Sequence, residues 1–287
     1  MVGEMTSTGF SVLRNFFPVD QIDAINEKIE VLFENNNCLG PAVNVAGLSG
    51  VELESYGDLR EKFKKANPNY MVSQDLINSG DKDYRNLTIG QNIEQPLINV
   101  PELFNIVTNK HIIDLVSNYL NSSDVRVGYV KIRRYFANNA PDFDTNIFHI
   151  DDNSQALVKA IIYLSDIYED DDGVFCYVSG SKDNVITEPG YSEINPLIRS
   201  NDQVYSFYGE KSVHKIFASR GSVVLADTLG LHKGTKTRTK DRTALYVNYV
   251  LEEEYGGKGV RQKIASKHFD DDPKLKSLFE YFEIVGD

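Results

Sequence analysis

Apolar residues recur at helical spacing in two stretches of the N-terminal part of the chain. The first stretch begins after Pro18, and the second covers residues 100–120. In the first stretch the apolar positions are Ile22, Ile25, Ile29, Leu32 and Phe33. Spacing of three or four residues aligns apolar side chains on one face of a helix, which then packs on a core. The pattern therefore predicts a helical part over about residues 1–120.

The middle of the chain, about residues 124–251, consists of short runs rich in β-branched and aromatic residues. Residues 223–227 and 242–251 are the clearest runs, and Gly- or Asp-containing turns separate the strands. Short strands with flanking helices favour a mainly β fold with a double-stranded β-helix core, the cupin-type jelly roll. The strand pattern alone does not separate this fold from an immunoglobulin-like sandwich.

The end of the chain, about residues 262–287, predicts a short helical tail. Asp272 lies near the start of the tail, and Pro273 falls in its first turn, where the missing N–H of proline has no cost. No internal repeat or low-complexity segment interrupts the sequence. We therefore expect one domain over residues 1–287, with a helical N-terminal part, a jelly-roll core and a helical tail.

Composition excludes several classes of protein. The net charge of −12 argues against a nucleic-acid partner, whose phosphates require a basic surface. The two cysteines, Cys38 and Cys176, have no metal-type spacing and fit a reducing compartment. No secretory signal and no apolar run of about 18 residues is visible. We therefore expect no membrane span and a cytoplasmic location.

His149 and Asp151 are the first candidates for chemistry. In an extended strand, residues i and i+2 point to the same face, so both side chains can reach one point. Non-haem Fe(II) is often held by two histidines and one carboxylate on one face, which leaves positions open for co-substrate and oxygen. A His-x-Asp tripeptide also arises often by chance on a surface strand, so the hypothesis requires a third ligand.

His232 is the best candidate for the third ligand. It follows the apolar run 223–227, so we expect it at the end of a strand, where a sandwich brings it opposite the first pair. His214 is the one serious rival, but it lies near a charged loop and a structural role suits it better. His111 lies in a helical pattern and His268 begins the tail, and both are poorer choices.

Arg242 opens the run 242–251 and is a candidate for binding an anion. Strand alternation places Arg242, Ala244, Tyr246 and Asn248 on one face. A buried arginine is costly without an anionic partner, and its planar fork suits a carboxylate. An exposed edge arginine is the ordinary alternative. Arg238 competes for the same role but lies in a polar stretch typical of a solvated loop.

Four stretches in this order resemble the phytanoyl-CoA dioxygenase-like branch of the Fe(II)/2-oxoglutarate-dependent oxygenases. They are the opening GFSVLRNFFPVDQIDAINEKIEVLFE, FHIDD with the following VKAIIYLSDIYEDDDGVFCYVSGSKD, GSVVLADTLGLHKG, and DRTALYVNYV. The resemblance spans roughly residues 8–251. It implies a jelly roll in which His149, Asp151 and His232 bind Fe(II) and Arg242 binds the co-substrate 2-oxoglutarate. Lys182 departs from the family, which commonly has histidine after the Gly-Ser turn.

The resemblance implies hydroxylation of a C–H bond of a small molecule or of a sugar- or lipid-linked metabolite. The reaction consumes O2 and couples to decarboxylation of 2-oxoglutarate to succinate. Related halogenases carry a small residue in place of Asp151, so its presence favours hydroxylation. Two alternatives stay open: a non-catalytic cupin-like metal- or ligand-binding protein, and a metal-dependent enzyme without a keto-acid co-substrate. Substrate recognition is expected from residues 36–100, which carry no readable motif, and the sequence predicts no oligomeric state.

Overall fold

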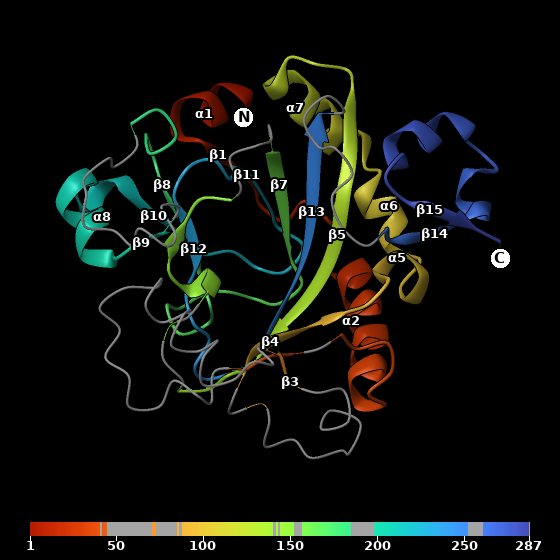
Figure 1. Ribbon diagram of the computed structural model, residues 1–287, viewed down its shortest axis with the longest axis horizontal. Helices are drawn as coiled ribbons and strands as arrows, with labels where there is room; N and C mark the ends of the chain where they lie inside the picture. The colour runs from red at the N-terminus through yellow and green to blue at the C-terminus, as the bar shows by residue number, and fades with distance from the viewer. Residues whose placement is uncertain are drawn as a thin grey trace.

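The computed structural model describes residues 1–40, 42–44, 71–72, 85, 88–139, 142, 144–151, 157–184, 198–251 and 261–286. Most of the segment expected to recognise substrate, residues 36–100, therefore lies outside the described residues. Two β-sheets face one another, and helices cover the outer face of the larger one (Figure 1).

The larger sheet has eight strands within the described ranges, in the order β1-β11-β7-β13-β5-β4-β2-β3. Their bounds are β1 (Phe10–Leu13), β2 (Ala42–Asn44), β3 (Met71–Val72), β4 (Thr88–Ile93), β5 (Val125–Tyr135), β7 (Leu157–Tyr163), β11 (Val223–Asp227) and β13 (Arg242–Leu251). All these pairings are antiparallel. The long strands β5 and β13 lie at its centre, where both faces of the sheet are covered.

The smaller sheet has five strands in the part of the chain that is described, in the order β10-β8-β12-β6-β9. Their bounds are β6 (Phe148–His149), β8 (Phe175–Val178), β9 (Ile198–Arg199), β10 (Val213–Ile216) and β12 (His232–Gly234). Successive strands β5, β6, β7 and β8 alternate between the two sheets, as do β10, β11, β12 and β13. This winding between two facing antiparallel sheets is that of a jelly roll, so the predicted fold class is confirmed.

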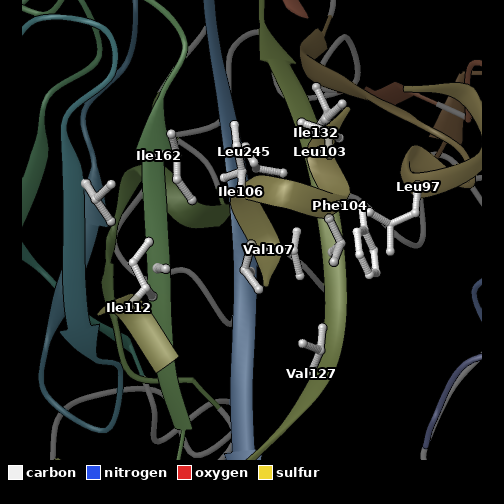
Figure 2. Packing of buried hydrophobic residues seen from close by; sticks show 14 of the residues in the cluster. Leu97, Leu103, Phe104, Ile106, Val107, Ile112, Val127, Ile132, Ile162 and Leu245 are labelled. Carbon is white, nitrogen blue, oxygen red and sulfur yellow. The ribbon is translucent and has the colours of Figure 1, made fainter. Parts of the chain in front are cut away.

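The helices pack on the outer face of the larger sheet. They are α2 (Val19–Glu34), α5 (Pro96–Asn99), α6 (Leu103–Val107) and α7 (Lys110–Leu120), with α1 (Val2–Thr8) and α8 (Asn201–Tyr208) elsewhere. Figure 2 shows Ile106, Val107 and Ile112 of this helical layer lying over Leu245 and Ile162 of the sheet. Each such side chain contributes about 1.5–3 kcal/mol on full burial, so this layer fixes the outer face of β5, β7 and β13.

Helix α2 buries the face that its apolar spacing predicts. Ile22, Ile25, Ile29 and Phe33 are buried, and Leu32 is partly buried against the same cluster. Helix α7 begins where the side chain of Asn109 accepts hydrogen bonds from two backbone N–H groups of the first turn. Such a cap satisfies donors that the helix itself leaves unpaired.

Strand β13 separates two hydrophobic cores by strict alternation. Leu245, Val247 and Tyr249 belong to the cluster under the helices, whereas Ala244 and Tyr246 belong to the cluster between the two sheets. Arg242 and Asn248 share the second face because they are two residues from Ala244 and Tyr246. The inner face of β13 therefore carries polar groups into the space between the sheets.

The tail forms two 3₁₀ segments, η5 (Ser266–Phe269) and η6 (Pro273–Phe279), between the short parallel strands β14 (Lys263–Ala265) and β15 (Glu283–Val285). The side chain of Asp272 caps η6 by accepting from the Lys274 N–H, and Pro273 is its first residue. Over the described ranges, no helix is long and apolar enough to cross a membrane.

Candidate metal centre and co-substrate site

His149 and His232 lie directly opposite each other on neighbouring strands of the smaller sheet. The register pairs His232 of β12 with His149 of β6, and the ring centroids are 4.4 Å apart. We expected His232 at the end of a strand, where a sandwich brings it opposite the pair. Instead, the turn after Asp227 carries the chain from the larger sheet into the smaller one, and His232 begins β12.

Asp151 completes a compact group with the two histidines. Its backbone N–H donates to the Thr228 carbonyl oxygen at 2.9 Å, which holds the segment after β6 against the turn before β12. Its Oδ1 lies 4.0 Å from Nε2 of His149, and its Oδ2 lies 3.8 Å from Nε2 of His232. One ligand atom from each of the three residues lies within 4.8 Å of the others.

Backbone hydrogen bonds fix the tautomer of both rings. Nδ1 of His149 donates to the Ile147 carbonyl oxygen at 2.7 Å, and Nδ1 of His232 donates to the Gly230 carbonyl oxygen at 2.9 Å. A carbonyl oxygen only accepts, so each Nδ1 carries the proton and each Nε2 presents a lone pair. Burial, together with the nearby His149, lowers the pKa of His232 to about 3, which keeps this ring neutral near pH 7.

Lys159 is a polar neighbour of the group that the sequence analysis missed. It lies on the inner face of β7, and its Nζ is 2.5 Å from Oδ2 of Asp151. Burial by itself raises the pKa of Asp151, but the neighbouring Lys159 ammonium, with further contributions from His232 and His149, outweighs burial and holds this pKa far below its usual range. The sequence does show a lysine, Lys159, within the otherwise apolar run of residues 157–163. Which residue this lysine contacts, however, depends on how the strands pair, and the sequence alone does not give that pairing.

Arg242 lies on the same inner face and is almost fully buried, with 2% of its surface exposed. Its Nε and Nη2 have no hydrogen-bond partner among the described residues. The guanidinium carbon lies 5.2 Å from the ring centroid of Tyr135 and 5.6 Å from that of Tyr163. Gly173 packs closely against it, since a Cβ there would lie 2.9 Å from Cδ of Arg242.

The rival residues lie outside this group. Arg238 is 42% exposed and lies 3.9 Å from Asp142 and 3.7 Å from Asp171. His214 lies on β10, where its Nε2 shares a hydrogen bond of 3.1 Å with the Ser179 hydroxyl and its ring packs on Phe10. The other two histidines, His111 and His268, stack on Phe16 and Phe104 beside the helices.

Lys182, which departs from the family pattern, points away from the three-residue group. Its ammonium lies 2.5 Å from Oδ2 of the buried Asp227, and the Tyr119 hydroxyl donates to the same oxygen at 2.6 Å. Lys182 and Tyr119 border a polar cavity of about 430 Å³ near α1. Lys182 therefore ties the turn after β8 to the end of β11.

The donor set fits a divalent iron ion and the basic group fits a dicarboxylic acid. Two imidazoles and one carboxylate on one side suit Fe(II) and leave coordination positions open on the other side. Arg242 offers two unpaired, buried N–H donors, whose burial is costly without an anion. The residues present are therefore chemically suited to iron and 2-oxoglutarate.

No family model matches the sequence, and the search of curated proteins found no similar protein. Solved structures are similar in fold. HygX from Streptomyces hygroscopicus, with nickel, 2-oxoglutarate and hygromycin B bound, is 16% identical with a TM-score of 0.54, over 88% of this chain and 86% of that one.

Two enzymes of nogalamycin biosynthesis are similar to the same degree. The epimerase SnoN, in complex with ferric iron, α-ketoglutarate and nogalamycin RO, is 11% identical with a TM-score of 0.54, over 87% of this chain and 81% of that one. The non-haem α-ketoglutarate-dependent carbocyclase SnoK is 16% identical with a TM-score of 0.53, over 87% and 82%. The chain therefore has the jelly-roll fold of 2-oxoglutarate-dependent oxygenases, and the phytanoyl-CoA dioxygenase-like branch stays a prediction.

Proposed function

We propose that this protein is an Fe(II)/2-oxoglutarate-dependent dioxygenase that hydroxylates a C–H bond of a small molecule or of a sugar- or lipid-linked metabolite. One observation carries the proposal. His149, Asp151 and His232 present three ligand atoms to one point, and the buried Arg242 presents unpaired donors on the same inner surface. An iron site and a carboxylate site together are what this chemistry requires.

His149, Asp151 and His232 would hold Fe(II), and Arg242 would bind the distal carboxylate of 2-oxoglutarate. The bound iron, 2-oxoglutarate and O2 supply the oxidant, with 2-oxoglutarate converted to succinate and CO2. The chain itself orients the ligands: the two carbonyl contacts fix the imidazoles, and Lys159 fixes one oxygen of Asp151. The apolar cluster between the sheets packs beside the site and limits its exposure to water.

The similar structures support the co-substrate and leave the reaction outcome open within the class. HygX was solved with nickel and 2-oxoglutarate, SnoN is described as an epimerase, and SnoK as a carbocyclase. HygX was solved with hygromycin B bound and SnoN with nogalamycin RO bound, and SnoK comes from nogalamycin biosynthesis. These similar structures support a small-molecule substrate here. Hydroxylation is our proposal because the site has the carboxylate ligand that hydroxylases use, at Asp151.

The test is succinate release from protein loaded anaerobically with Fe(II) and 2-oxoglutarate and then exposed to O2. We expect succinate from the wild-type protein and none above background from His232→Ala, which lacks a ligand. His214→Ala is the matched control, because this histidine lies outside the site, and it should behave as wild type. Tight binding of metal and 2-oxoglutarate without any succinate would instead indicate a non-catalytic cupin-like binding protein.

A further inference from the structure

The turn between β11 and β12, residues 228–231, holds two of the three candidate metal ligands. The Thr228 carbonyl oxygen accepts from the backbone N–H of Asp151 at 2.9 Å. The Gly230 carbonyl oxygen accepts from Nδ1 of His232 at 2.9 Å. These contacts place the backbone of Asp151 and orient the ring of His232, so the geometry of both ligands depends on the 228–231 turn.

The carboxylate of Asp227 fixes the conformation of this turn. Asp227 is the last residue of β11, and 3% of it is exposed. Its Oδ1 accepts from the backbone N–H of Leu229 at 3.1 Å, and its carbonyl oxygen accepts from the backbone N–H of Gly230 at 3.1 Å. An aspartate that accepts from the backbone two residues ahead closes a turn by itself. The 228–231 turn therefore follows the position of Asp227.

Lys182 and Tyr119 hold the other oxygen of this carboxylate. Nζ of Lys182 lies 2.5 Å from Oδ2 of Asp227, and the Tyr119 hydroxyl donates to the same oxygen at 2.6 Å. A buried carboxylate is costly without such partners. Lys182 supplies the compensating charge, and Tyr119 supplies a neutral hydrogen bond.

Ser181, which precedes Lys182 in the chain, holds the opposite end of the turn. Its Oγ accepts from the backbone N–H of Leu231 at 2.7 Å and donates to the Val178 carbonyl oxygen at 2.6 Å. Two consecutive residues after β8 therefore hold both ends of the 228–231 turn, with Lys182 at Asp227 and Ser181 at Leu231.

Close packing gives the turn little room to move. A Cβ at Gly230 would lie 2.0 Å from the hydroxyl oxygen of Tyr177. That hydroxyl donates to the Asp227 carbonyl oxygen at 2.8 Å, and the strand register pairs Tyr177 with His232. Packed interiors transmit a displacement to their neighbours. A shift of Asp227 should therefore reach the backbone beside His232.

We propose that Lys182 is a positioning residue for the metal centre, acting through Asp227 and the 228–231 turn to hold Asp151 and His232 in their binding geometry. This role belongs to the lysine that departs from the family pattern. The inference rests on the metal-binding part of the proposed function, because it concerns the ligands of that site.

The affinity for Ni(II), measured by calorimetry at pH 7.5 without 2-oxoglutarate, tests the proposal. Lys182→Met keeps the length of the side chain but removes its charge, and it should weaken Ni(II) binding by roughly tenfold, as loss of a group that orients metal ligands does. Lys182→Arg restores a charged donor and should recover most of the affinity. Tyr119→Phe leaves the lysine in place and should weaken binding less than Lys182→Met does.

Arg220→Met is the matched control. The side chain of Arg220 is 32% exposed, against 39% for Lys182, and it pairs with Asp23 and Asp166 just before β11. This variant also removes one positive charge and an ion pair, but at the end of β11 that lies away from the 228–231 turn. It should bind Ni(II) as wild type does. Urea unfolding of every variant separates a loss of stability from a loss of metal affinity.

Bound Co(II) gives a second readout that stability alone does not change. Its visible absorption depends on the geometry of its ligands. At saturating Co(II), Lys182→Met should change this spectrum, whereas Arg220→Met should reproduce that of wild type. If Lys182→Met does not fold, Tyr119→Phe serves in both measurements, with the same direction of change expected.

Three results overturn the proposal. Lys182→Met binds Ni(II) as wild type does, Arg220→Met loses as much affinity as Lys182→Met, or Lys182→Met binds weakly but keeps the wild-type Co(II) spectrum. If wild-type protein binds Ni(II) but releases no succinate with Fe(II), 2-oxoglutarate and O2, the proposed function fails and the affinities still decide the role of Lys182. A wild-type protein that binds no Ni(II) contradicts both.

Discussion

Nζ of Lys159 lies 2.5 Å from Oδ2 of Asp151, within a group whose other two members are His149 and His232. In the metal-free protein this ammonium compensates the partly buried carboxylate. A divalent metal held by the same carboxylate would lie beside a positive charge. Lys159 therefore stabilises the empty site and at the same time opposes the metal.

Lys159→Met should destabilise the metal-free protein and increase the stabilisation that metal provides. Removing one partner of this partly buried ion pair leaves the other charge uncompensated, at a cost below the ~3 kcal/mol of a fully buried pair. Ni(II) then replaces the missing cation without repulsion from the ammonium. Thermal melts with and without Ni(II) should give a larger rise in Tm for the variant than for wild type.

The double variant Lys159→Met/Asp151→Asn separates this account from simple loss of packing. Without the carboxylate there is no uncompensated charge, so the double variant should be more stable than Lys159→Met alone when metal is absent. An equal or smaller metal-induced rise in Tm for Lys159→Met would contradict the electrostatic role assigned to the lysine.

Acid should destabilise the metal-free protein through His232. The pKa of this ring is about 3 in the folded protein and 6.5 ordinarily, so the unfolded chain takes up a proton first as the pH falls. The stability is therefore full above pH 6.5 and decreases as the pH falls toward 3, by about 1.4 kcal/mol per pH unit below 6.5. Asp151 adds its own loss only below about pH 4, where the unfolded carboxylate protonates.

Urea unfolding in the presence of a chelator at pH 7, 6 and 5 measures this effect. His232→Gln should give a flatter dependence on pH than wild type over this range. His111→Gln, at an exposed histidine of α7, is the control and should keep the wild-type slope. A wild-type slope in His232→Gln would show that other groups cause the acid sensitivity.

Periodicity explains which parts of the site could be predicted. The His-x-Asp spacing and the alternation along β13 follow from local strand geometry, so His149, Asp151 and Arg242 could be chosen from the sequence. The placement of His232 beside His149 depends on a turn that crosses between sheets, and no periodic pattern encodes such a crossing. The sequence places His232 at the end of the strand that precedes it, whereas in the structure His232 begins the next strand, β12, and lies opposite His149.

Lys159 was missed for a related reason. It is visible in the sequence as a charged residue in a strand-like run, but whether it points inward, and toward which partner, depends on the register of three strands. The consecutive residues Arg133 and Arg134 show the ambiguity. Arg133 points between the sheets toward Asn92, whereas Arg134 points outward and pairs with Glu30 of α2.

Gly173→Ala should damage 2-oxoglutarate binding, and Gly180→Ala should not. Both glycines have positive φ, +84° and +79°, so alanine costs each of them about 1 kcal/mol of stability or more. At Gly173 the new Cβ would also lie 2.9 Å from Cδ of Arg242, whereas at Gly180 no atom lies within 4 Å. The pair therefore separates backbone strain, which both share, from displacement of the arginine.

Denaturant unfolding and 2-oxoglutarate titration on the two variants test this directly. Similar losses of stability with a loss of affinity confined to Gly173→Ala are the expected result. Equal 2-oxoglutarate affinity in the two variants would mean that the contact with Gly173 does not position Arg242.

Arg242, rather than Arg238, should determine the affinity for 2-oxoglutarate. The guanidinium of Arg242 is buried with two unpaired N–H donors, whereas Arg238 is 42% exposed beside Asp142 and Asp171. A bidentate contact to a carboxylate in a dry site is a strong charge-assisted pair, so Arg242→Ala should weaken 2-oxoglutarate binding by about 3 kcal/mol, roughly a hundredfold in Kd. Arg242→Lys keeps the charge but not the planar fork and should recover only part of the loss.

Arg238→Ala should bind 2-oxoglutarate as wild type does, because solvent already screens the charge of Arg238. Calorimetric titration of 2-oxoglutarate into Ni(II)-loaded protein gives all four values, and a damaging Arg238→Ala beside a normal Arg242→Ala would place the co-substrate on the loop instead of on β13.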